Sequence, residues 1–183
     1  MKYRVWLITA ASLFVISIIV GWSIPDDISG LLGEDIAQLT QLSNFLLSLP
    51  PIVTALLIFL KNSLSLVLSF AFSPLLCLMP LLALLSNGAL LGWVSARVIE
   101  RESIGLLLAG ILPHGVIELP AFIIGEAAAL SFGSLVIVSL FKAEARGMLW
   151  PHLKQNLKYL TIALALLIPA AFIEAFLTPL LIK

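Results

Sequence analysis

Five ionisable side chains lie inside segments that are otherwise almost free of charge: Lys61, His114, Glu118, Glu126 and Glu174. If these segments cross a bilayer, each such group costs about 2.5–3.5 kcal/mol at the bilayer centre. We therefore expect the groups to bind one another, water or a ligand. A histidine near carboxylates can bind and release protons. The same groups can also bind Zn²⁺ or another divalent cation, with one coordination position left open for water.

The run LPHGVIELPAF concentrates this chemistry. His114 and Glu118 are four residues apart, which places both on one face of a helix. Pro120 has no N–H, so the carbonyl of Val116 loses its helical donor, and Gly115 lets another backbone or a ligand approach closely. The run predicts a functional centre, although a buried His–Glu pair that only fixes helix packing would use the same two side chains.

Depth in the membrane brings Glu174 to this centre. A helix rises about 1.5 Å per residue, so Glu118 and Glu174 fall at similar heights in the outer half of a core roughly 30 Å thick. We therefore predict a cluster of His114, Glu118 and Glu174, and these three are the candidate metal ligands.

Four other polar residues are candidates for the same site or for its surroundings. Glu126 lies about two turns deeper than Glu118, as a second step toward the cytoplasm or as part of a packed interface of small residues. Lys61 either neutralises one acid or extends its ammonium group to the interface. Asn62 and Asn87 are expected to bond across helices or to line the site.

Composition supports the membrane setting. Of the 183 residues, 61% are hydrophobic and 11% are charged, and the mean hydropathy is +1.17. A soluble domain usually has about a quarter of its residues charged. Basic and acidic residues number 10 each, so no net positive field would attract nucleic acid, and the single Cys77 excludes an internal disulfide.

Apolar runs long enough to cross a bilayer occur at about 5–24, 51–72, 74–98, 113–141 and 159–182. The first exceeds the apolar core of a signal peptide and is not followed by a cleavage pattern, so we interpret it as an uncleaved span. The fold class is therefore an all-α polytopic transmembrane bundle, forming a single domain over 1–183.

Two further helices are predicted outside the spans. Residues about 34–49 carry leucine and isoleucine at helical spacing opposite polar residues, which indicates an amphipathic helix in the interface plane. The run at about 103–112 is too short to cross and ends at Pro113, which favours a re-entrant half-helix with a break beside His114. Two tight spans within 103–141 are the competing interpretation.

Basic residues set the expected orientation. Lys2 and Arg4 flank the first span, the first loop is acidic, and the loop before the last span is strongly basic. Basic residues favour the cytoplasmic side. We therefore expect a multi-pass protein of the cell (plasma) membrane with a cytoplasmic N-terminus and an external C-terminus.

The same polar segments carry a family resemblance. FLKNSLSL, LLSNGALLGW, LPHGVIELPAF and AAFIEAFLTP together resemble the stage II sporulation protein M family of multi-pass membrane proteins. The resemblance places seven residues at the family's motif positions: Asn62, Asn87, Gly88, His114, Gly115, Glu118 and Glu174. The family's named member acts in engulfment during spore formation, in a complex with peptidoglycan-degrading partners.

Three functions follow from these features. The first, which we favour, is a membrane scaffold or assembly subunit that contacts the bilayer, a second copy in a homodimer, or membrane and cell-envelope proteins. The second is an ion- or proton-coupled transporter of small solutes, and the third is an intramembrane divalent-metal-binding protein. Neither HExxH nor GxSxG occurs, so no motif indicates an enzyme.

Overall fold

The computed structural model describes residues 3–25 and 49–181, and every regular element in these ranges is a helix. The long helices are α1 (Tyr3–Trp22), α3 (Pro51–Phe72), α4 (Leu78–Arg101), α5 (Ile104–Phe141) and α7 (Leu149–Phe176), and the short ones are α6 (Ala143–Arg146) and α8 (Thr178–Leu181). Five helices, counting α7 together with α8, are long and apolar enough to cross a membrane. The predicted helical membrane bundle is thus confirmed, while the interfacial helix predicted at about 34–49 lies outside the described residues, apart from its last position.

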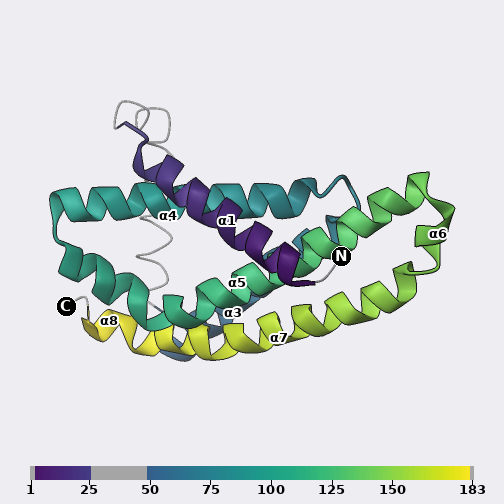
Figure 1. Ribbon diagram of the computed structural model, residues 1–183. Helices are drawn as coiled ribbons and strands as arrows, with labels where there is room; N and C mark the ends of the chain where they lie inside the picture. The colour runs from purple at the N-terminus through teal and green to yellow at the C-terminus, as the bar shows by residue number, and fades with distance from the viewer. Residues whose placement is uncertain (1–2, 26–48, 182–183) are drawn as a thin grey trace.

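Helix α5 differs from the prediction at its N-terminal end. Instead of a half-helix at 103–112 followed by a break, one helix of 38 residues runs from Ile104 to Phe141, with Pro113 and Pro120 inside it. Figure 1 shows that its axis bends, so that a short N-terminal arm turns across the end of the bundle before the long arm begins. A proline removes one backbone hydrogen bond and favours a bend, so the helix accommodates both prolines without ending.

The long arm of α5 lies beside α7, and α1 crosses α4 (Figure 1). The α1–α4 crossing is close because the contact residues are small. A Cβ atom added to Gly92 would collide with the carbonyl oxygen of Ile18, and one added to Gly88 would collide with the Ser17 hydroxyl. That hydroxyl donates to the carbonyl of Phe14 in its own helix at 2.8 Å and lies 3.2 Å from the carbonyl of Leu84 across the contact. The pair Gly88 and Gly92 therefore forms the small-residue packing face that its four-residue spacing predicts.

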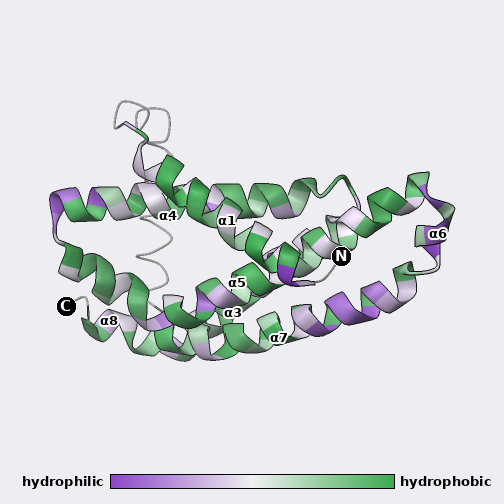
Figure 2. Cartoon of the chain, in the orientation of Figure 1, coloured by the Kyte–Doolittle hydropathy of each residue, from purple (hydrophilic) through white to green (hydrophobic). Residues whose placement is uncertain are grey.

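Apolar and hydrophilic side chains occupy different parts of the bundle. Figure 2 shows apolar residues over most of the long helices, and hydrophilic residues gathered around α6, the start of α7 and the end of α4. At the start of α1, the ring of Tyr3 stacks on Tyr159 with centroids 3.6 Å apart, and its hydroxyl donates to the carbonyl of Ile124 at 2.8 Å. These two contacts tie α1 to both α5 and α7, which together carry the cluster described below.

Candidate functional site

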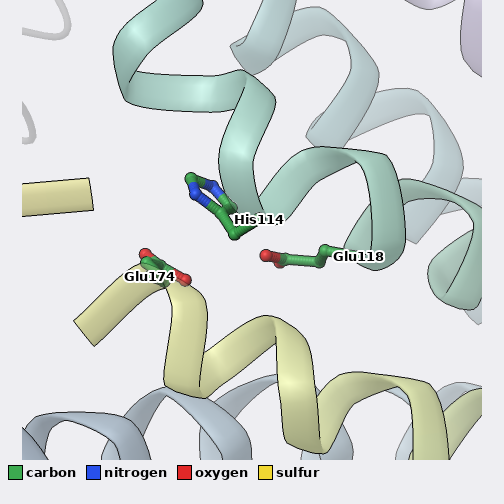
Figure 3. A group of neighbouring side chains, drawn as sticks. All are labelled: His114, Glu118 and Glu174. Atoms are coloured by element: carbon green, nitrogen blue, oxygen red, sulfur yellow. The ribbon is translucent and has the colours of Figure 1, made fainter. Parts of the chain in front are cut away.

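His114, Glu118 and Glu174 converge between α5 and α7. Each offers one ligand atom, and these three atoms lie within 4.8 Å of one another (Figure 3). All three side chains are half-buried. The helical repeat of α5 supplies two of the groups, and its bend lies next to His114 (Figure 3). The structure therefore brings together the three residues that the sequence selects as candidate ligands.

Two polar side chains outside this trio orient it. The Asn62 amide of α3 donates to Oε1 of Glu118 at 2.8 Å. Nδ1 of His114 lies 3.3 Å from Oγ1 of Thr178, a hydroxyl that itself donates to the carbonyl of Ile173 at 3.5 Å. In the tautomer that carries its proton on Nδ1, the imidazole donates to the threonine oxygen. This tautomer leaves the Nε2 lone pair for a ligand, as in many metal sites where a second shell fixes the imidazole.

The charges of the cluster do not balance within it. When both are ionised, two carboxylates no more than 4.8 Å apart repel by about 3.5 kcal/mol or more at an effective dielectric constant of 20. Lys61 interacts electrostatically with Glu174, but its own side chain is exposed. A cation or a shared proton among the three groups would offset the remaining repulsion.

A cavity of about 210 Å³ opens beside the cluster. Its polar lining comes from three helices and consists of Lys61, Asn62, Ser65, Asn87, His114 and Glu118. Asn87 donates to the carbonyl of Ala83 in its own helix at 2.8 Å, whereas Asn62 bonds across helices. The cavity lining therefore includes Lys61, Asn62 and Asn87, the three polar candidates other than the cluster and Glu126.

Glu126 lies apart from the cluster. Its side chain is 0% exposed, and Oε2 accepts a hydrogen bond of 2.5 Å from the Ser69 hydroxyl of α3. Within the described part of the chain, Oε1 has no hydrogen-bond partner. The structure therefore separates Glu126 from the candidate metal ligands and places it at a packed α3–α5 contact.

Removing the Ser69 hydroxyl is expected to destabilise the protein, because both carboxyl oxygens of Glu126 would then be buried without a partner. The variant Ser69→Ala should lose about 1–3 kcal/mol of unfolding free energy. Ser134→Ala is the matched control, since the half-buried Ser134 hydroxyl donates only to the carbonyl of Ser131 in its own helix. Thermal unfolding in detergent compares the two, and equal stabilities would contradict the assigned contact.

Sequence reasoning missed three polar residues that accompany these acids: Ser65, Ser69 and Thr178. A signal was present in each case. Thr178 follows Glu174 by four residues, as Glu118 follows His114. Asn62, Ser65 and Ser69 are spaced by three and four residues, which defines one face of α3.

Comparison with known proteins gives a consistent result. The profile of the family described as Stage II sporulation protein M matches residues 10–179. An uncharacterized protein of Methanocaldococcus jannaschii is 26% identical over 178 residues, which cover 96% of this chain and 95% of that protein. No solved structure matches the chain to a significant degree.

Proposed function

The chain belongs to the stage II sporulation protein M family of multi-pass membrane proteins. We propose that it is a membrane scaffold, and that a divalent cation bound to His114, Glu118 and Glu174 holds its helices together at the outer end of the bundle. The convergence of one imidazole and two carboxylates within 4.8 Å carries this proposal. Zn²⁺ accepts such a mixed nitrogen and oxygen donor set.

The proposed role of the cation is to join helices. Two ligands come from α5 and one from α7, and the orienting residues Asn62 and Thr178 come from α3 and α8. A cation at this point links α5 to α7, while the second-shell bonds extend the connection to α3 and α8. A scaffold needs such rigidity because its partners bind to surfaces whose relative positions must stay fixed.

The scaffold role itself rests on the family and on the surface. Large apolar side chains are exposed along the helices, among them Ile8, Val116 and Leu140 at 64–65%. In a membrane these faces contact lipid, a second copy in a homodimer, or membrane and cell-envelope proteins. The positive-inside pattern supports an orientation with the N-terminus in the cytoplasm, and we propose the plasma membrane as its location.

Metal analysis of the purified protein tests the cation site. After reconstitution with Zn²⁺ and removal of free metal, a preparation without a histidine tag should retain about one ion per chain. His114→Ala should retain almost none, because one of the three protein ligands is gone. His152→Ala is the matched control, since this second histidine lies in the first turn of α7 and is not part of the cluster. A wild-type protein that retains no stoichiometric metal would refute the site.

A further inference from the structure

Glu126 occupies the middle of the membrane-spanning part of α5. The helical rise places it about 18 Å from His114 and about 22 Å from the end of the helix at Phe141. Its carboxyl group is fully buried, accepts one hydrogen bond from Ser69 and has one oxygen without a partner in the described part of the chain.

Packing alone does not explain an acid at this place. Small and apolar residues surround Glu126 along α5, and Ala127 and Ala128 beside it are completely buried. A leucine or glutamine could fill the volume without the cost of burying an ionisable group. A single hydroxyl donor does not offset the desolvation of a carboxylate, so an acid at this depth costs more than packing requires.

A polar face on α3 leads from the cavity to this group. Asn62, Ser65, Ser69 and Ser73 follow one another at spacings of three or four residues. Asn62 contacts Glu118 and Ser69 contacts Glu126, which shows that this face lies against α5. Ser73, which is 0% exposed, continues the face toward the turn between α3 and α4.

A thin apolar barrier closes the cavity on the side of Glu126. Leu66 and Phe122 belong to the cavity lining, and Phe122 precedes Glu126 by one helical turn. Leu66 is 2% exposed and packs on Gly125, where an added Cβ would lie 2.8 Å from its Cδ2.

We propose that Glu126 is a proton-binding site through which protons cross the membrane. A proton passes from the cavity to Oε1 of Glu126 when Leu66 and Phe122 move apart, and leaves along the Ser69–Ser73 face of α3 to water at the membrane surface, so no other bond forms or breaks. This activity goes beyond the scaffold role and does not require a cation at the cluster.

Proton uptake into liposomes tests the proposal with the full chain. A potassium gradient with valinomycin provides the driving force, and an entrapped pH-sensitive dye reports the internal proton concentration. Wild-type protein should acidify the lumen faster than protein-free liposomes, and Glu126→Gln should fall to the protein-free rate. This variant is expected to fold, because its side-chain oxygen still accepts from Ser69. Glu144→Gln, an acid in α6 outside the spans, should retain the wild-type rate.

Substitutions in the apolar barrier provide an independent test of the proposal. Leu66→Val makes the barrier smaller and should raise the uptake rate, while Leu64→Val, an exposed position on the same helix, should leave it unchanged. Infrared spectra report occupancy directly: a carboxylic-acid carbonyl band should be present in wild-type protein, disappear in Glu126→Gln and shift in D₂O. Uptake by Glu126→Gln at the wild-type rate, or no uptake by wild-type protein, would overturn the proposal. Zinc content measured on the same preparations should not change, which keeps this test separate from that of the cation site.

Discussion

Replacing Gly92 by alanine should lower the thermal midpoint of unfolding in detergent by roughly 10 °C, which corresponds to about 3 kcal/mol for a chain of this size. The added methyl group would collide with the backbone carbonyl of Ile18 in α1. A backbone oxygen cannot rotate away as a side chain can, so α1 and α4 must separate. Separation also breaks the neighbouring contacts of Gly88 and Gly21, because all three glycines belong to the same crossing.

The direction of this stability change distinguishes a close helix contact from a helix position with free space. A glycine inside a helix is normally about 0.5–1 kcal/mol less stable than alanine, so the substitution should stabilise any helix that has space for it. Gly105→Ala is the matched control: Gly105 is exposed in the first turn of α5, and its added Cβ meets only the Ser103 hydroxyl, at 3.7 Å. We expect the control to melt at or above the wild-type temperature. A Gly92→Ala protein that melts with it would show that the α1–α4 contact is looser than described.

The architecture could be predicted because lipid imposes a simple rule on the chain. A span must be long, apolar and helical, and five such segments are visible in the sequence. The end of α4 and the beginning of α5 were harder to predict. Pro113 has the properties of a helix start, yet Ser103, ten residues earlier, caps the helix by accepting from the amide of Leu106 at 3.1 Å. The proline then only bends α5, since the packed neighbours α1, α4 and α7 hold the rest of the helix in place.

The candidate site could also be predicted only in part: the positions set by the helical repeat and by membrane depth were predicted, and the contacts set by helix rotation were not. His114 and Glu118 are linked by the helical repeat, and Glu174 joins them because an estimate of membrane depth gives it a similar height. The partners Thr178 and Ser69 were not predicted, because each contact depends on how two helices are rotated about their axes. Hydropathy measures depth but carries no information about rotation. For the same reason two roles for Glu126 stay open in the sequence, a second step toward the cytoplasm or part of a packed interface of small residues, and the structure places its carboxyl group at a packed α3–α5 contact.

Removing the cation from the proposed site is expected to lower the stability of the folded protein strongly. A ligand that binds only the folded state at a thousand times its Kd contributes about 4 kcal/mol of stability. For a chain of 150–250 residues this corresponds to a thermal midpoint about 10 °C higher. A chelator should therefore lower the midpoint of the zinc-loaded protein by about this amount, and added Zn²⁺ should restore it. Thermal scans in detergent, before and after chelation, give the measurement.

A pair of carboxylate variants separates a bound cation from a shared proton, the other way to offset the repulsion between Glu118 and Glu174. In the double variant Glu118→Gln and Glu174→Gln the repulsion is absent and two ligands are lost, so the midpoint should no longer respond to a chelator. The fold should survive, because the new amide oxygen at position 118 still accepts from Asn62. Glu102→Gln with Glu144→Gln removes the same number of charges outside the cluster and should keep the full response. A wild-type midpoint that does not respond to chelation would contradict the cation site, and a double variant as stable as wild type would then indicate that a shared proton already offsets the repulsion.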